Sequence, residues 1–208
     1  MLYLRDMNYF VTAINTDSGK TLVSAILTEM LGADYWKPIQ SGLPRDTITV
    51  QSLISNGRSN FYKEAYLLNT PASPHYSAAV DQVNISLDEI VPPVSNRDLV
   101  IEGAGGVMVP LNDHDIILDL VPKLNAEIIL VSNLYLGSIN HTLLTAEFIK
   151  SRGSKVRGII FNGSDPSASI DIILKKTGLK CLLHLSREDE INKEVVKKYA
   201  EQLRLCWD

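Results

Sequence analysis

The amino-acid sequence predicts an α/β fold, a doubly wound, mostly parallel sheet with helices on both faces, in a single domain over residues 1–208. Short apolar runs such as LVI, IILVS and GIIF look buried on both faces, which is typical of strands in parallel sheets. Amphipathic stretches separate these runs, and strands that alternate with helices indicate right-handed βαβ units. A chain of 208 residues is also long enough for one complete core.

Each strand is predicted from an apolar run bounded by polar or turn-forming residues. The expected strands are Tyr9–Ile14, Tyr35–Lys37, Leu99–Glu102, Glu127–Ser132 and Val156–Phe161, with a weaker candidate at Lys180–His184. The expected helices between them are Thr21–Leu31, Asp46–Ile54, Ile116–Leu124, Asn140–Ser151, Ser169–Thr177 and Asp189–Leu203. The segment Asn69–Ser77, NTPASPHYS, is expected to be an ordered turn region, because apolar patterning resumes on both sides.

The first strand runs directly into a candidate phosphate-binding loop, FVTAINTDSGKT at residues 10–21. In such loops backbone N–H groups surround the phosphates, the lysine reaches the terminal phosphate, and the hydroxyl serves Mg²⁺. The generic G-x-x-x-x-G-K-[ST] spacing fails, because Ile14 stands where the first glycine belongs. The loop is interpreted as a variant phosphate binder; the alternative is an ordinary strand–turn–helix corner with a solvated Lys20.

Glu102 ends another apolar run, in DLVIEGAGG, at the edge of the sheet where doubly wound folds bind ligands. A carboxylate there is typical of a Mg²⁺ site beside a phosphate-binding loop. The alternative is a carboxylate that caps a turn made by Gly103, Gly105 and Gly106. The same glycines permit a close approach of the backbone to a phosphate or carboxylate.

Lys37 ends a short predicted strand in YWKPIQSG, where Pro38 prevents the strand from continuing as a helix. Followed by Ser41 and Gly42, it is placed to reach the same phosphates; alternatively, it is a surface lysine beside a turn. Asp46 begins a predicted helix, and two roles stay open for it: the helix N-cap, or a second carboxylate for Mg²⁺.

LGSINHTLLTAE, residues 136–147, is predicted to be a loop that enters a helix. Gly137 and Ser138 supply the turn and the cap, which leaves unpaired N–H groups suited to an anion. His141 has no partner at metal-ligand spacing and is interpreted as structural. The sequence contains no Ser–His–Asp set, zinc-ligand spacing or complete G-x-G-x-x-G fingerprint, so no protein nucleophile is expected.

Composition argues against several classes of protein. The net charge of −4 and the lack of a basic stripe with interleaved aromatic residues argue against nucleic-acid binding. Cys181 and Cys206 lack metal-ligand spacing and suit a reducing compartment. Arg5-Asp6 and the polar loop do not match a signal peptide, and no apolar run reaches membrane-spanning length. A cytoplasmic location without membrane contact is therefore expected.

In series, six sequence blocks resemble the dethiobiotin synthetase family, P-loop NTPases that close the ureido ring in biotin biosynthesis. The blocks are YFVTAINTDSGKT, YWKPIQSG, ASPHYSAA, LVIEGAGGVMVPL, LGSINHTLLTAE and FNGSDP, and they span most of residues 9–166. The GKT motif is shared by many nucleotide enzymes, whereas KPIQSG, EGAGG and GSINH in this order are much more specific.

The loop of this family is one residue longer than the generic P-loop, which accounts for the failed spacing and places Ala13 at the family's glycine position. If that position needs a positive φ, alanine costs about 1 kcal/mol or more. If it is extended, the methyl group is tolerated unless it abuts the nucleotide. A second departure is HLSRED, which stands where family members often carry a Gly-x-Ile-Pro turn, so the nucleobase contacts there stay open.

The resemblance implies a role for each site residue. The residues implied to bind ATP are Asn15, Thr16, Asp17, Ser18, Gly19, Lys20, Thr21, Gly103, Ala104, Gly105 and Asn162, the last at the adenine. The implied Mg²⁺ ligands are Thr21, Asp46 and Glu102. Lys20 and Lys37 would be catalytic, with Lys37 and Ser41 on the carbamate and the transferred phosphoryl group. The residues implied to receive the substrate carboxylate, at a homodimer interface, are Gly137, Ser138 and Asn140.

The implied reaction converts 7,8-diaminopelargonate (7,8-diaminononanoate), CO₂ from bicarbonate, and ATP to dethiobiotin, ADP and phosphate. Because phosphoryl transfer needs positioning and charge neutralisation, it requires no protein nucleophile. One alternative is a switch ATPase of the partition or septum-positioning type. That type carries an extra lysine early in the loop, and this loop has none there. A nucleotide-binding relative with little turnover is the other alternative, because of Ala13.

Overall fold

The computed structural model describes residues 7–164 and 167–207, so the end of the FNGSDP block and the segment with Arg5-Asp6 lie outside the described residues. Within the described chain, seven strands form one sheet in the order β4-β2-β6-β1-β7-β8-β9, and every neighbouring pair is parallel. Their bounds are β1 Asn8–Ala13, β2 Asp34–Trp36, β4 Phe61–Tyr62, β6 Leu99–Gly106, β7 Ala126–Asn133, β8 Val156–Asn162 and β9 Cys181–Leu185. A second, two-stranded parallel sheet pairs β3 (Ile39–Ser41) with β5 (Tyr66–Leu68).

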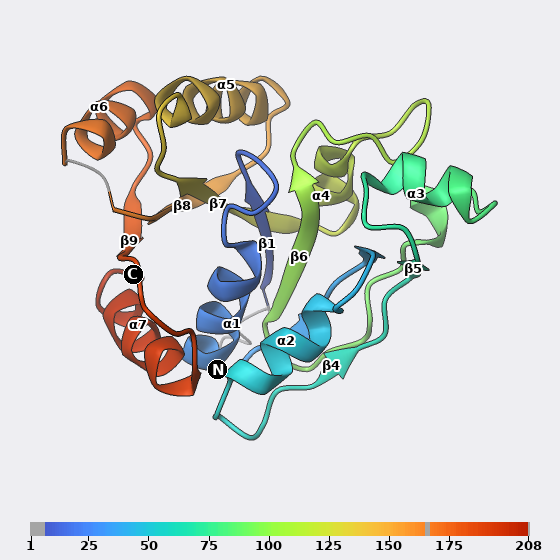
Figure 1. Ribbon diagram of the computed structural model, residues 1–208, viewed down its shortest axis with the longest axis horizontal. Helices are drawn as coiled ribbons and strands as arrows, with labels where there is room; N and C mark the ends of the chain where they lie inside the picture. Colours follow the sequence, from blue (N-terminus) through green and yellow to red (C-terminus); the bar gives the residue numbers. More distant parts are fainter. Residues whose placement is uncertain (1–6, 165–166, 208) are drawn as a thin grey trace, which may run out of the picture.

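Helices cover both faces of the large sheet (Figure 1). The α-helices are α1 Lys20–Leu31, α2 Asp46–Leu53, α3 Pro74–Val80, α4 Leu120–Lys123, α5 Ser138–Ser151, α6 Ser167–Thr177 and α7 Lys193–Leu205. Two short 3₁₀ helices span Leu87–Glu89 (η1) and Ile117–Asp119 (η2). In Figure 1, α5 and α6 lie on one side of the sheet, and α1, α2 and α7 lie on the other.

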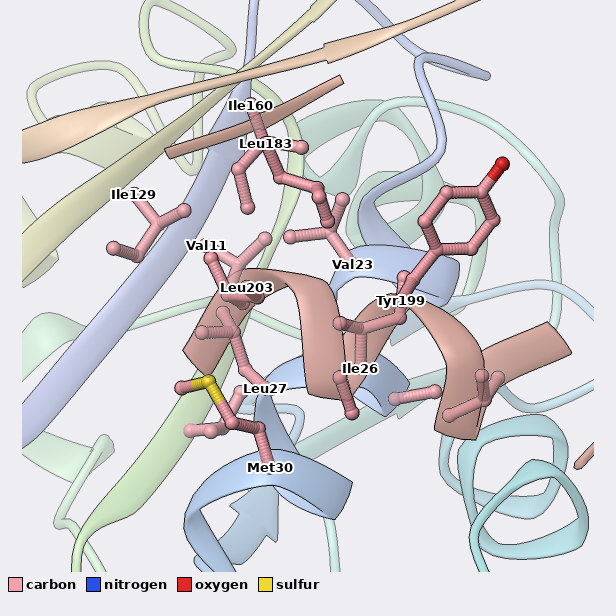
Figure 2. Packing of buried hydrophobic residues seen from close by; sticks show 14 of the residues in the cluster. Val11, Val23, Ile26, Leu27, Met30, Ile129, Ile160, Leu183, Tyr199 and Leu203 are labelled. Carbon is pink, nitrogen blue, oxygen red and sulfur yellow. The ribbon is translucent and has the colours of Figure 1, made fainter. Parts of the chain in front are cut away.

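Alternating side chains of the strands build these two layers. In β1, Val11 packs into the core under α1 and α7, whereas Phe10 packs into the core on the opposite face. In β7, Ile129 packs into the same core as Val11, and Ile128 packs into the same core as Phe10. Figure 2 shows the first core, in which Leu27 of α1 lies among side chains of α7 and of the central strands. The two-faced burial confirms the predicted doubly wound α/β fold.

Most differences from the predicted elements are small, and each has a local cause. β6 continues past the predicted end at Glu102 to Gly106, because Gly106 pairs with Ala13 of β1. The pairing is irregular between Glu102 and Gly106, where Gly105 has φ 69°. α7 begins at Lys193, later than predicted, because the Asn192 side chain accepts hydrogen bonds from the N–H groups of Glu194 and Val195 and caps the helix there.

Other elements were not predicted. β3, β4 and β5 contain two or three residues each, too few for a period to be visible. The segment Asn69–Ser77 was predicted to be a turn region, yet α3 begins inside it at Pro74, a residue well suited to the first helical position. The predicted helix over Ile116–Leu124 is divided into η2 and α4.

Ala13 ends the strand at the centre of the sheet. It pairs with Val131 of β7 and Gly106 of β6, is fully buried, and is not among the described residues with positive φ. The position therefore does not need glycine on conformational grounds, and its methyl group packs in the core around α1. The sequence left open whether Ala13 needs a positive φ or has an extended backbone, and the extended conformation is correct.

We expect Ala13→Gly to lower the free energy of unfolding by on the order of 1 kcal/mol, because the chain gains backbone freedom when unfolded and loses a buried methyl group. Urea denaturation measures this difference. Ala126→Gly, at the partly exposed start of β7, is the matched control and should cost less. An Ala13→Gly variant that is more stable than the parent chain contradicts the assignment of the methyl group to the core.

Candidate active site

A cavity of about 720 Å³ lies at the carboxyl ends of β1 and β6. Its walls come from the loop after β1, the segment between β2 and α2, residues 71–74 before α3, and the glycine-rich end of β6. The predicted site residues that line it are Thr16, Asp17, Gly19, Lys20, Thr21, Lys37, Ser41, Asp46, Glu102, Ala104 and Gly105. The sequence thus predicted most of the residues that line the cavity.

The other predicted residues do not line this cavity. Those that lie beside it are Asn15, Ser18, Gly103 and Asn162. The Gly103 carbonyl oxygen accepts a hydrogen bond from Lys37 Nζ (3.3 Å), and the contacts of the other three are described below. Those at the start of α5 are Gly137, Ser138 and Asn140. Gly137 has φ 105° and precedes α5, Ser138 is buried as its first residue, and Asn140 is exposed two residues further along. Gly137 therefore supplies the predicted turn, but Ser138 is not the cap.

The loop after β1 is fastened to the ends of β7 and β8. The Ser18 hydroxyl is fully buried and bonds to the Asn15 carbonyl oxygen (2.9 Å) and to Asn133 Oδ1 (2.7 Å). Asn162 Nδ2 donates to the Ser18 carbonyl oxygen (3.0 Å). A Cβ at Gly19 would lie 2.4 Å from the same amide nitrogen, and Gly19 has φ 95°, so this position requires glycine. The Ser18 side chain therefore supports the loop from inside.

Lys20 begins α1 at the floor of the cavity and is only 7% exposed. Its Nζ donates to the Asn15 carbonyl oxygen at 3.3 Å. Burial and the positive charge of Lys37 lower the pKa of Lys20 to about 8. No side chain of the described residues caps the start of α1, so its first N–H groups and Lys20 face the cavity as an anion site.

Lys37 lies between the two carboxylates of the site. Its Nζ is 2.6 Å from Asp46 Oδ2 and 3.0 Å from Glu102 Oε1, and the residue is 4% exposed. The Thr21 hydroxyl lies 3.1 Å from Asp46 Oδ1 and 3.0 Å from Glu102 Oε1. Burial acts to lower the pKa of Lys37, but Glu102 and Asp46 outweigh it and raise the pKa, so the ammonium stays charged.

The positions of these side chains exclude three interpretations that the sequence left open. Lys37 is not a surface lysine, because it is buried between carboxylates. Asp46 is not the N-cap of α2, because Arg45 occupies that position and Asp46 is the first helical residue. Glu102 does not cap a turn, because it lies inside β6.

Two supporting residues were not predicted. Tyr35 is fully buried in β2, and its hydroxyl donates to Glu102 Oε2 (2.9 Å); burial and then the charge of Glu102 raise the pKa of Tyr35 well above its usual value. Gln40 Oε1 accepts the N–H of Asp46 (3.0 Å). Gln40 could have been identified from the sequence, because it belongs to the KPIQSG block. Tyr35 belongs only to a predicted strand, and no motif marks it as a site residue.

The oxygen ligands of the site suit a magnesium ion. Among residues 7–164 and 167–207, no group of three or more His, Cys, Asp or Glu side chains could hold a metal by itself. The two carboxylates and the Thr21 hydroxyl instead match Mg²⁺, which uses one or two carboxylates together with phosphate oxygens and water. Within the same described residues, no helix is long and apolar enough to cross a membrane.

Solved structures with a similar fold include a MinD protein and a ParA family ATPase. The septum site-determining protein MinD of Pyrococcus horikoshii, solved in complex with Mg-ADP, has a TM-score of 0.61 at 14% identity, covering 95% of each chain. A ParA family ATPase of Chlorobium tepidum has a TM-score of 0.59 at 12% identity, covering 96% of this chain and 91% of its own. At such low identity these similarities show the fold alone.

Two curated relatives, both named ATP-dependent dethiobiotin synthetase BioD, align with nearly the whole chain. The protein of Cytophaga hutchinsonii is 56% identical over 201 residues, covering 96% of this chain and 98% of its own. The protein of Christiangramia forsetii is 49% identical over 204 residues, with the same coverage. The AAA domain family AAA_26 matches residues 7–195. The chain therefore belongs to the AAA domain family and, within it, to the ATP-dependent dethiobiotin synthetases.

Proposed function

We propose that this protein converts 7,8-diaminopelargonate, CO₂ and ATP to dethiobiotin, ADP and phosphate. The observation that carries the proposal is the 56% identity, over 96% of the chain, to a protein named as a dethiobiotin synthetase. The cavity supports it, because the anion-binding end of α1 and a charged lysine line the same space. The partition-type ATPases resemble the chain at only 12–14% identity, so the switch function is not favoured.

The reaction proceeds through three bond-forming steps. One amine of the substrate adds to CO₂ and forms a carbamate. The carbamate oxygen then attacks the terminal phosphorus of ATP and releases ADP, and the second amine displaces phosphate from the mixed anhydride as the ring closes. The chain must therefore hold two anions, carbamate and triphosphate, in line and neutralise charge on the transferred group.

Lys20 and the first N–H groups of α1 are proposed to hold the triphosphate, with Thr16, Asp17 and Gly19 on the same wall of the cavity. The proposal is supported by the left-handed conformation of Gly19 (φ 95°) and Asp17 (φ 56°), which bends the loop around the end of the helix. Ala104 and Gly105 complete this wall from β6. Asn162, which touches the loop at Ser18, is proposed to contact the adenine beyond it.

Thr21, Asp46 and Glu102 are proposed to hold Mg²⁺, since their oxygens converge within hydrogen-bonding distance. The ion, when bound, neutralises charge on the phosphate oxygens. Lys37 is proposed to bind the carbamate and the transferred phosphoryl group, because its charge lies at the same edge of the cavity. Ser41 Oγ is buried without a partner among the described residues and is proposed to bond the substrate beside Lys37.

The start of α5 is proposed to bind the substrate carboxylate in the cavity of a second copy of the chain. Gly137, Ser138 and Asn140 do not line the 720 Å³ cavity of their own chain. The buried Ser138 hydroxyl has no partner among the described residues, and the exposed Leu136 and Leu144 flank it. A homodimer through this surface is therefore proposed, in the cytoplasm.

Purified protein should release phosphate from ATP only when both the diamine and bicarbonate are present. Lys37→Met should lower kcat by roughly 10²- to 10³-fold. The substitution removes a positive charge that stabilises the negative charge on the transferred phosphoryl group in the transition state. A coupled phosphate assay measures both effects, with the exposed Lys197→Met on α7 as the matched control. ATP hydrolysis without the diamine, together with ATP-driven dimerisation, would contradict the proposal and support the switch ATPase.

Sedimentation of the purified chain should give twice the 23.0 kDa mass of one chain. Leu144→Asp should shift the protein to monomers and weaken diamine binding while nucleotide binding persists, because a charge is costly inside an apolar interface. Leu205→Asp, at another exposed leucine, in α7, should leave the dimer intact. Full diamine affinity in a monomeric Leu144→Asp protein is the contrary result.

Nucleotide binding at pH 8 should take up protons. Part of Lys20 is neutral at that pH because its pKa is lowered to about 8, and an anion beside Nζ favours the charged form and raises the pKa. Affinity should therefore fall as the pH rises above 8. Calorimetry in buffers of different ionisation enthalpy measures the uptake. Lys20→Arg stays charged and should lose the uptake; equal uptake by both proteins would show that another group is responsible.

A further inference from the structure

Glu64 is a buried carboxylate outside the catalytic cavity. It lies in the connection between β4 and β5, and its side chain is fully inaccessible to solvent. Burying a carboxylate is unfavourable unless its oxygens are paired. Its partners therefore indicate what this residue stabilises.

Both side-chain partners of Glu64 lie next to Asp46 in the sequence. Arg45 Nε donates to Glu64 Oε1 (3.1 Å), and Arg45 Nη2 donates to Glu64 Oε2 (2.5 Å). The two residues therefore form a bidentate ion pair. The Thr47 hydroxyl donates to Glu64 Oε1 (2.7 Å). The residues before and after Asp46 are thus fastened to a single buried carboxylate.

These bonds hold the side chains on either side of Asp46 at the start of α2. The helix begins at Asp46 without a side-chain cap, and the N–H of Asp46 is held from the other side by Gln40 Oε1. Glu64 and Gln40 come from the two segments that β3 and β5 bring together. Glu64 thus holds the neighbouring side chains, and Gln40 holds the N–H of Asp46 itself. In this arrangement the Asp46 carboxylate is directed toward Thr21 and Lys37.

We propose that Glu64 is a positioning residue that orients Asp46 for the cation of the site. The inference rests on the proposed function, in which Asp46 binds Mg²⁺. Partners that orient a metal-binding side chain commonly change metal affinity when they are removed. Loss of Glu64 also frees the guanidinium of Arg45, which can then approach the Asp46 carboxylate and compete with the cation. Glu64 lies outside the cavity and so touches no reacting atom.

The ion pair keeps its charge in the folded protein. Burial acts to raise the pKa of Glu64, but the hydrogen bonds from Thr47 and Arg45 outweigh it, and the net pKa is lowered. Glu64→Gln keeps the shape of the side chain and removes this charge, which makes it the appropriate test variant.

In Glu64→Gln the Mg²⁺ concentration for half-maximal activity should rise on the order of tenfold, while kcat at saturating Mg²⁺ and the KM for the diamine stay close to the parent values. Mn²⁺ binding to the ADP complex, followed by electron paramagnetic resonance, should weaken by a similar factor without turnover. Asp46→Asn, measured in parallel, should show a larger shift in both experiments.

Asp34→Asn is the matched control. Asp34 is also a buried carboxylate that accepts several hydrogen bonds, including those from Tyr62 and Ser95, but it lies at the opposite end of β2 from Lys37. This substitution should lower the melting temperature and leave the Mg²⁺ dependence unchanged. A shift as large as that of Glu64→Gln would overturn the inference, because it would show a general effect of destabilisation.

The outcomes separate the inference from the proposed function. If Asp46→Asn weakens Mn²⁺ binding and Glu64→Gln does not, the positioning role of Glu64 is wrong and the metal role of Asp46 stands. If neither variant changes Mn²⁺ binding, the proposed metal role fails and the inference fails with it. Should Glu64→Gln not fold, Thr47→Val removes one of the three bonds and should shift the Mg²⁺ dependence in the same direction by a smaller factor.

Discussion

A buried ammonium group between two carboxylates connects the separate segments that form this site. Lys37 follows β2, Asp46 begins α2, and Glu102 lies within β6. Lys37 and Glu102 are buried, whereas the Asp46 side chain is partly exposed. Removing Lys37 or Glu102 therefore leaves a buried charge without its partner, which is unfavourable. Tyr35 and Gln40 add hydrogen bonds to Glu102 and to the N–H of Asp46. The rest of the cavity is arranged around this fixed set of charges.

The two halves of the site are supported by different parts of the fold. Asn133 and Asn162, at the ends of β7 and β8, fasten the loop through Ser18. The carboxylate half depends instead on the small β3–β5 sheet, because it places Gln40 and Glu64 on either side of the start of α2. A change in one support can thus move the carboxylates while the start of α1 stays in place.

The large sheet and the cavity-lining Lys20, Lys37 and Glu102 could be predicted from the sequence, because long apolar runs and strand-end motifs are local signals. The role of Glu64 could not, since it depends on pairing between two three-residue strands that lie more than twenty residues apart. The backbone conformation of Ala13 could not be predicted either. A motif position names the residue that usually occurs there, but only the pairing of β1 with its neighbours shows that φ stays negative.

The uncapped start of α1 has a consequence for the stability of the whole fold. Serine, threonine, aspartate and asparagine are the preferred residues just before a helix, where their side chains accept hydrogen bonds from its first N–H groups. Here Gly19 occupies that position and supplies no such side chain. In the proposed function a bound phosphate would take the place of that side chain and complete the helix. The same helix packs against α7 through Leu27 and its neighbours (Figure 2). Occupancy of the loop should therefore slow amide hydrogen exchange well beyond the cavity, along α1 and into its contact with the C-terminal helix.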